Sequence, residues 1–178
     1  MPSAPTLIRP STDADVPAMT AIYAQAVLTG RASFEIEAPD ATEIARRRAD
    51  VLAKALPWLA AEADGQLLGY AYASPFRPRL AYRYTLEDSI YVHEAARGRG
   101  IGRLLLAELL ARCEAWGARQ MIAAIGDSNN RASIAVHASA GFAPVGTYRN
   151  VGRKFDEWLD VVLMQRTLGP GAAQPPDA

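Results

Sequence analysis

Three glycines alternate with other residues in the segment R-G-R-G-I-G-R, which runs from Arg97 to Arg103. Gly98, Gly100 and Gly102 let the backbone take left-handed angles and leave room for a ligand beside the main chain. If a helix begins here, its first N–H groups and the positive end of its dipole favour an anion. The arginines add charge-assisted donors. The segment therefore indicates a site for a pyrophosphate or sugar phosphate, although a tight turn with solvated arginines would have the same sequence.

Two better-known phosphate motifs are absent from this segment. The chain has no G-K-S or G-K-T sequence, which excludes a Walker loop. The string G-R-G-I-G-R lacks the third glycine of a dinucleotide fingerprint, and no acidic residue ends a following strand at the usual distance of about 20 residues. Both nucleotide-binding interpretations are therefore disfavoured.

The elements on either side of the glycine segment must position it. The sequence L-E-D-S-I-Y-V-H, residues 86–93, is typical of a strand. From Ile101 the apolar residues recur at spacings of three and four, through Leu105, Leu109 and Cys113 to Trp116, before Gly117. This pattern predicts a helix over residues 101–116, so the glycine segment joins a strand to a helix.

The rest of the chain predicts further strands and helices. Asp64-Gly65 between two apolar segments predicts a hairpin. The proline-containing segment from Ser74 to Leu80 is interpreted as a loop, and Arg46–Arg48 as a solvated helix face. Ser11, Thr12 and the acids after them are expected to cap the first helix. Strands are predicted at 6–9, 58–63, 66–73, 86–93, 120–125, 143–149 and 157–165, and helices ending near 28, at 42–53, at 101–116 and from 128 to the glycine at 141.

This order of elements predicts a mixed α/β fold with one sheet and helices on its faces. With 178 residues and 50% hydrophobic content, the chain is expected to form a single domain over residues 1–168. The last ten residues, 169–178, are rich in proline and glycine, so we expect a disordered tail.

Composition excludes several classes of partner. The 19 basic and 19 acidic residues balance, which disfavours binding to nucleic acid or an anionic membrane. Cys113 is the only cysteine and falls in an apolar helix pattern, so neither a disulfide framework nor a zinc site is expected. No segment has the length and character of a signal peptide or a membrane span. We expect a soluble, cytoplasmic protein that acts on small molecules.

The pattern R-x-x-G-x-G after the strand S-I-Y-V resembles the acetyl-CoA loop of the GNAT-type N-acetyltransferases. A second element of that superfamily, N-x-x-S in a helix followed by G-F, is matched by Asn130, Ser133 and Gly141-Phe142. The resemblance implies one central mixed, largely antiparallel sheet with helices on both faces, and acetyl-CoA as co-substrate without a metal. The implied acetyl-CoA contacts are Ile90, Tyr91, Val92, Arg97, Gly98, Arg99, Gly100, Ile101, Gly102, Arg103, Asn130 and Ser133.

Further motifs resemble the phosphinothricin N-acetyltransferase family over about residues 6–168. They include G-Y-A-Y-A-S-P-F-R, Y-T-L-E-D-S-I-Y-V, V-H-A-S-A-G-F and V-G-R-K-F-D-E-W-L-D. The implied acceptor is the α-amine of phosphinothricin, methionine sulfoximine or methionine sulfone. Acetylation of a peptide N-terminus or a polyamine would use the same cofactor loop, and a CoA-binding sensor without chemistry is a third alternative.

The resemblance also assigns catalytic roles. It places the family's general base at Glu87, which would take a proton from the attacking amine. Many superfamily members have a tyrosine in the helix before G-F that protonates the departing CoA thiolate, and this chain has His137 there. His137 is therefore the candidate acid, but it could also orient the substrate or pack in the interior. Asp88 would point to the opposite face of the strand from Glu87.

The acceptor would need fixed cationic groups. A carboxylate and a phosphinate or sulfoximine suit planar guanidinium groups, which favours Arg77 and Arg79 in the loop before the Glu87 strand. Phe76 and Tyr82 would line the site beside them. The family resemblance implies a homodimer whose pocket borrows from the partner subunit, so Lys154, with Phe155, is expected to complete the site.

Overall fold

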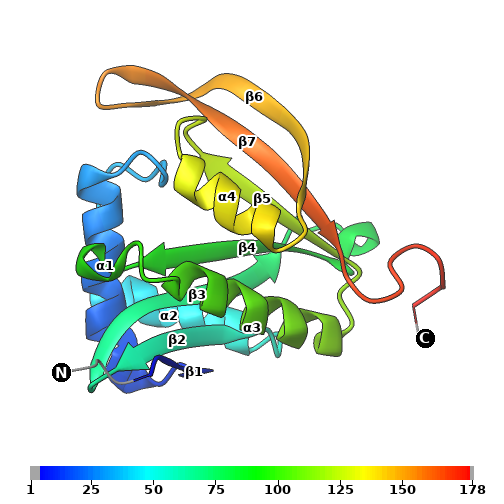
Figure 1. The fold of residues 1–178 in the computed structure, drawn as a ribbon, viewed down its shortest axis with the longest axis horizontal. Helices are drawn as coiled ribbons and strands as arrows, with labels where there is room; N and C mark the ends of the chain where they lie inside the picture. The colour runs from blue at the N-terminus through cyan, green and yellow to red at the C-terminus, as the bar shows by residue number, and fades with distance from the viewer. Residues whose placement is uncertain (1–4, 177–178) are drawn as a thin grey trace.

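Seven strands form one sheet in the computed structural model, which describes residues 5–176. The spatial order is β1-β2-β3-β4-β5-β7-β6 (Figure 1). Neighbouring strands are antiparallel apart from β4 and β5, which run parallel. The strands are β1 (Leu7–Pro10), β2 (Trp58–Ala63), β3 (Gln66–Pro75), β4 (Thr85–Val92), β5 (Gln120–Gly126), β6 (Ala143–Lys154) and β7 (Glu157–Thr167).

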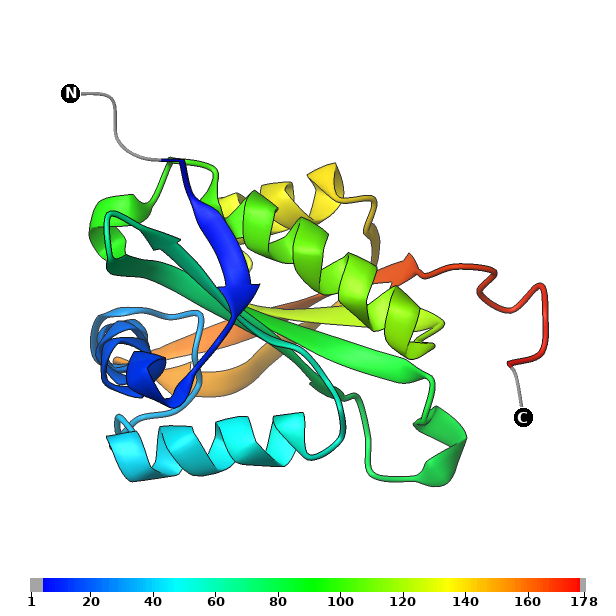
Figure 2. The same ribbon diagram turned by 90° about the horizontal axis from the view of Figure 1, so that it is seen from below.

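Four α-helices cover the two faces of the sheet. Figure 2 shows α1 (Val16–Thr29) and α2 (Ala41–Leu52) on one face, and α3 (Ile101–Trp116) and α4 (Arg131–Ser139) on the other. Short 3-10 helices lie at Asp13–Asp15, Leu80–Tyr82 and Glu94–Ala96. None of the helices within residues 5–176 is long and apolar enough to cross a membrane.

Strands β4 and β5 are paired over only a short distance. Their partners are Thr85 with Gln120, Leu86 with Met121, and Glu87 with Ile122. Beyond Glu87, β4 continues to Val92 and β5 to Gly126 without pairing to each other, and Figure 1 shows them diverging. We call this opening between the two strands the fork.

The prediction for α3 is confirmed at both ends. Leu105, Leu109 and Cys113 are fully buried, as the three-and-four spacing indicates. Gly117 ends the helix in a left-handed conformation, with φ of 104°. Trp116 departs from the prediction, since it is 37% exposed and its indole N–H donates to the carbonyl oxygen of Lys54.

Two sequence interpretations are wrong. Ser74 and Pro75 extend β3 instead of belonging to a loop, because Pro75 is the last residue of the strand, where the missing N–H costs little. Arg48 is buried, with Nε donating to Ser11 Oγ at 2.7 Å and Nη2 to Ser11 O at 2.6 Å. Arg48 lies on the same helix face as Ile44 and Val51, so it packs inward while Arg46 and Arg47 pair with carboxylates.

The end of the chain follows β7 in turns. The N–H of Gly171 donates to the carbonyl oxygen of Leu168, and the Arg119 guanidinium donates to that of Pro175 at 3.4 Å. The Arg119 bond connects Pro175 to the residue that precedes β5. Residues 177 and 178 of the predicted disordered tail, and residues 1–4 of the predicted domain, lie outside the described residues.

Candidate active site

The glycine segment forms an open backbone turn at the start of α3. Gly98 and Gly100 have φ values of 75° and 80°, and a Cβ atom added to either would meet no atom within 4 Å. The first helical bonds run from the N–H groups of Arg103 and Leu104 to the Gly100 carbonyl oxygen. The preceding amides of the helix therefore lack an intrahelical acceptor and are available to a ligand.

The arginines of this segment are exposed. Arg97, Arg99 and Arg103 all face solvent, and none of the three takes part in the ion pairs found within residues 5–176. Ile101 anchors the turn because its side chain is buried at 2% exposure. The turn thus offers free backbone donors and free cationic groups beside one another, an arrangement suited to phosphate.

The second half of β4 leads from the fork to this turn. Ile90, Tyr91 and Val92 pair with Ala71, Tyr70 and Gly69 of β3 on one edge. On the other edge they have no partner in β5. The backbone groups on the fork side can therefore bond an extended ligand that carries amides.

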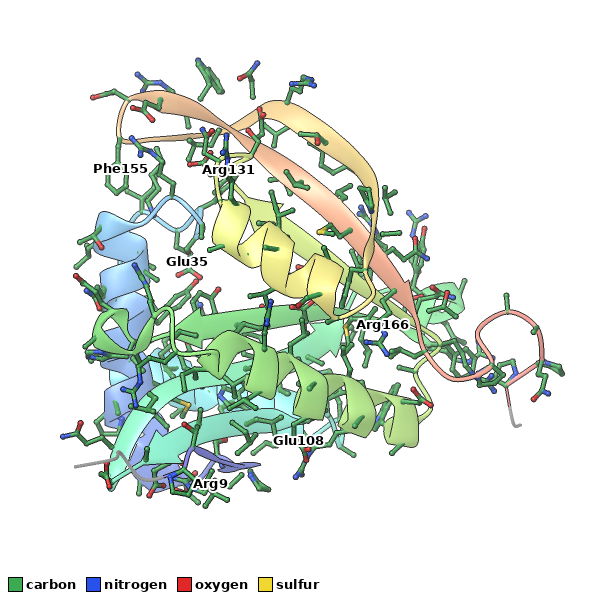
Figure 3. All side chains as sticks on the ribbon, in the orientation of Figure 1. Arg9, Glu35, Glu108, Arg131, Phe155 and Arg166 are labelled. Carbon is green, nitrogen blue, oxygen red and sulfur yellow. The ribbon has the colours of Figure 1, made fainter. Side chains whose placement is uncertain are left out.

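Asn130 caps the helix on the far side of the fork. Its Oδ1 accepts the backbone N–H of Ser133 at 3.2 Å, and this confirms that α4 begins here. Because the oxygen is used in the cap, the amide NH₂ group of Asn130 is the part left for a ligand. Arg131, which was not among the predicted contacts, stands at the same helix end (Figure 3).

Glu87 lies at the apex of the fork. It is the last residue of β4 that pairs with β5, and it stands opposite Ser74 of β3. Burial raises the pKa of its half-buried carboxyl, as does the nearby charge of Asp88, whereas Arg77 lowers it. Since Asp88 faces α4, strand alternation directs Glu87 towards the face covered by α1 and α2. A carboxylate whose pKa is raised in this way is a stronger base than a fully solvated one, which suits proton transfer.

His137 is buried, and both nitrogens of its ring have hydrogen-bond partners. Its Nε2 lies 2.9 Å from Asp88 Oδ2, and its Nδ1 lies 2.8 Å from the carbonyl oxygen of Ser133. The His137 and Asp88 side chains are only 5% and 2% exposed. Burial alone would lower the pKa of His137, but the hydrogen bond and charge of Asp88 raise it above the ordinary histidine value.

The predicted acceptor residues after β3 do come together. The rings of Phe76 and Tyr82 meet edge to face, with centroids 5.8 Å apart. The Arg77 guanidinium lies 5.0 Å from the centroid of the Phe76 ring, and its charge acts on Glu87. Arg79 is exposed and precedes the short helix that contains Tyr82. This segment thus places cationic and aromatic groups at the fork apex.

Lys154 lies in a different place from this segment. It ends β6, is 6% exposed, and donates from Nζ to the carbonyl oxygen of Ser33 at 2.7 Å. Its ammonium also lies 5.1 Å from the centroid of the Phe155 ring. Burial lowers the pKa of Lys154. The structure therefore connects Lys154 to the segment between α1 and α2 of its own chain.

A network that the sequence reasoning missed borders the Glu87 face. Arg47 Nη1 and the Tyr23 hydroxyl donate to Glu35 Oε1 at 2.6 and 2.7 Å (Figure 3 labels Glu35). Burial raises the pKa of Tyr72, and the charges of Arg47, Glu35 and Glu87 also act on it. Tyr72 is therefore within electrostatic reach of both this network and Glu87. The only sequence signal was the F-E pair at residues 34–35.

Two surface hollows lie away from Glu87. One of about 560 Å³ is lined by residues that include Arg31, Asn150 and Asp160, and one of about 300 Å³ by residues that include Ile36 and Phe155. No group of three or more potential metal ligands occurs within residues 5–176.

Comparison with known proteins adds to this geometry. A model of the acetyltransferase (GNAT) family matches residues 21–142. The phosphinothricin N-acetyltransferase of Alcaligenes faecalis is 54% identical over 170 residues, which cover 96% of this chain and 86% of that protein. The L-methionine sulfoximine/L-methionine sulfone acetyltransferase of Pseudomonas paraeruginosa is 41% identical over 172 residues, covering 94% of this chain and 98% of that protein.

Solved structures agree with the sequence comparisons. A GNAT superfamily phosphinothricin acetyltransferase from Sinorhizobium meliloti, in complex with AcCoA, superposes with a TM-score of 0.94 at 43% identity. The superposition covers 97% of this chain and 93% of that chain. The predicted fold, a mixed sheet with helices on both faces, is confirmed.

Proposed function

Because this chain belongs to the acetyltransferase (GNAT) family, we propose that it acetylates the α-amine of a small amino-acid analogue. The chain is an N-acetyltransferase that uses acetyl-CoA as its co-substrate. The acceptor class rests on relatives named for phosphinothricin and for methionine sulfoximine and sulfone. One observation carries the proposal in this chain: Glu87, with Arg77 acting on it, lies at the apex of the fork whose other end is the glycine turn.

The acetyl-CoA would lie along the fork. The amides from Gly98 to Gly102, with Arg97, Arg99 and Arg103, would hold the pyrophosphate, since they offer free donors at a helix start. The amide-bearing arm would pair with the unpartnered edge of β4 at residues 90–92. Asn130 and Ser133, at the start of α4, would contact the arm from the opposite side. This placement brings the thioester to the fork apex beside Glu87.

Glu87 would act as the general base. A free α-amine, with a pKa near about 8, is largely protonated at neutral pH and must lose a proton before it attacks the thioester carbonyl. The Glu87 carboxylate takes that proton directly or through one water while the C–N bond forms. When the tetrahedral intermediate collapses, the C–S bond breaks and its electron pair leaves with sulfur.

His137 would supply the proton to sulfur. Nδ1 faces a backbone carbonyl, so only the Nε2 proton, shared with Asp88, can be given up. To donate this proton, Nε2 must break its hydrogen bond to Asp88 and turn to the thiolate sulfur. The proton taken by Glu87 then returns to His137 through solvent, which balances the reaction.

Acceptor recognition would fall to Arg77 and Arg79 beside Phe76 and Tyr82. The guanidinium groups suit the acceptor carboxylate and its anionic or polar head group. They also disfavour a polyamine, because like charges would meet.

A homodimer is the proposed assembly. Large apolar side chains on the β6–β7 hairpin stay exposed, and such patches mark contact surfaces. In the dimer, the exposed Phe155 would lie at the edge of the partner's pocket, while the neighbouring Lys154 stays bonded to Ser33 of its own chain. The exposed side chains are Val145, Tyr148, Val151, Phe155 and Trp158, at 61%, 52%, 55%, 49% and 63%.

Thiol release from acetyl-CoA tests the proposal. We expect turnover when phosphinothricin, methionine sulfoximine or methionine sulfone is added to the purified protein. Glu87→Gln should lower kcat about 10²- to 10⁴-fold and leave CoA binding nearly unchanged. Glu108→Gln, a control at a half-buried glutamate that pairs with Arg112 on α3, should have little effect on kcat. No turnover with any of the three acceptors would contradict the acceptor assignment. Turnover with only peptides or polyamines would replace it, and CoA binding without thiol release from any amine would indicate a sensor.

A further inference from the structure

Asp88 and His137 form a buried ionisable pair at the fork. They are 49 residues apart in sequence, and their side chains are among the least exposed polar groups described. Asp88 is the first residue of β4 beyond the last pairing with β5. His137 belongs to α4, which follows β5 in the chain. The pair therefore ties the two sides of the fork together next to its apex.

The hydrogen-bond partners of His137 limit the protonation states that the ring can adopt. The Ser133 carbonyl oxygen can only accept, so Nδ1 must carry a hydrogen. An ionised Asp88 carboxylate can also only accept, so Nε2 must carry a second hydrogen. The arrangement is satisfied by an imidazolium beside a carboxylate. A neutral imidazole would leave a lone pair facing one of the two oxygens unless Asp88 itself held the proton.

Among residues 5–176, Asp88 is the charged side chain that acts on the ring. Phe142 packs edge to face on the imidazole, with centroids 5.1 Å apart. Cys113 of α3, which also feels the charge of Asp88, is fully buried, and burial raises its thiol pKa to about 12, so it stays neutral. Glu87 feels the charge of Asp88 but projects from the opposite face of β4. The carboxylate of Asp88 is thus the group that supports the imidazolium.

A contribution to the stability of the fold does not explain the Asp88–His137 pair by itself. Asp88 Oδ1 is buried and has no hydrogen-bond partner within the described part of the chain. Burying an ion pair carries a large desolvation cost for each ion, and well-packed apolar residues often stabilise a fold equally well. An incompletely satisfied carboxylate, placed where acetyl transfer would occur, points to a role in the reaction.

We propose that Asp88 is a positioning residue for acetyl transfer, which keeps His137 protonated and in place at the fork. This inference rests on the proposed function, because the proton so held is the one His137 would give to sulfur. The C–S bond breaks, sulfur takes the Nε2 proton, and Asp88 is left facing a neutral ring. The carboxylate then favours return of the proton and restores the pair.

Histidine NMR tests the protonation state without acetyl-CoA. The chain has two histidines, His93 and His137, so selectively labelled rings give two signals, with exposed His93 as the internal reference. In the wild type, His137 should keep its proton to a higher pH than in Asp88→Asn, where a neutral amide replaces the carboxylate. The same titration of His137 in both proteins would overturn the proposal.

The pH profile of kcat tests the consequence for the reaction. With both substrates saturating, the alkaline fall of kcat should begin at lower pH in Asp88→Asn, with a loss of about tenfold at high pH for each pH unit of displacement. Below that limb, kcat should recover to within about threefold of the wild type. Asp88→Glu, which restores the charge, should move the limb back towards higher pH. An equal loss in Asp88→Asn at every pH would overturn the proposal.

Two further variants separate the outcomes. Asp88→Ser removes the charge with less volume, and failure of both charge-removing variants to fold would overturn the proposal, since the pair would then serve the fold. Glu87→Gln should abolish most turnover yet leave the His137 titration as in the wild type. If the wild type is inactive but its His137 still keeps its proton to a higher pH than in Asp88→Asn, the proposed function is contradicted. If His137 titrates at the same pH in both proteins, the role of Asp88 is contradicted.

Discussion

Substitution of Gly100 by alanine separates the conformational role of the glycine turn from its role in binding. Gly100 has φ of 80°, Gly98 of 75°, and Gly65, in the distant β2–β3 turn, of 73°. An added Cβ meets no atom within 4 Å at any of the three. Alanine at each should therefore cost about 1–2 kcal/mol from the left-handed backbone alone. Gly65→Ala is thus a control matched in angle and in free space.

The expected effects on stability and binding differ. Each variant should lower Tm by about 2–8 °C, because 1 kcal/mol shifts Tm by about 2–4 °C in a domain of this size. Only Gly98→Ala and Gly100→Ala place a methyl group where the pyrophosphate would approach the backbone. Loss of one hydrogen bond to a charged group costs about 1.5–3 kcal/mol, which weakens CoA binding about 10- to 100-fold.

Calorimetric titration with CoA and thermal unfolding measure the two effects. S-acetylpantetheine, which lacks the pyrophosphate, supplies a further comparison, since its KM should change little in the loop variants. The reasoning would be refuted if Gly65→Ala weakened CoA binding as much as Gly100→Ala. It would also be refuted if Gly100→Ala left CoA affinity within about twofold of the wild type.

Three further predictions concern packing and pH. A Cβ at Gly152 would clash with the Phe34 ring, so Gly152→Ala should destabilise the fold by about 1–3 kcal/mol in denaturant unfolding, and less in the background of Phe34→Ala. Arg48→Ala should cost about 2–4 kcal/mol by the same measurement, because it leaves buried acceptors unpaired. Since the Glu87 pKa is raised and the base acts when ionised, kcat/KM should fall as pH falls through that raised value. Arg77→Ala, which removes an opposing charge, should move this acid limb to higher pH.

The elements with a strong local pattern could be predicted from the sequence. The helix over 101–116 was predicted at both of its observed ends, because a sustained apolar stripe and a terminating glycine are local properties. The hairpin at Asp64-Gly65 was equally clear, and both residues have the positive φ values its turn requires. The burial of Arg48 could also have been predicted, since Arg48 lies four residues after Ile44 and three before Val51 on one helix face. Three consecutive arginines favoured a solvated face instead.

Contacts between distant segments could not be predicted in this way. Strand alternation placed Asp88 opposite to Glu87, but nothing local indicated that His137 of another element would meet it. Lys154 was expected at a pocket shared between subunits, and its bond to Ser33 depends on how the hairpin packs over the α1–α2 connection. Such pairings are decided by tertiary packing, which neither periodicity nor turn residues record.

The short pairing between β4 and β5 has a mechanical consequence. Within residues 5–176, three residue pairs between β4 and β5 join the four strands β1 to β4 to the three strands β5, β7 and β6, and we call this junction the seam. A long ligand bonded both along β4 and to the start of α4 would hold the two sides of the seam together. We therefore expect the protein to resist proteolysis and amide exchange at the seam in proportion to how much of it is loaded with co-substrate.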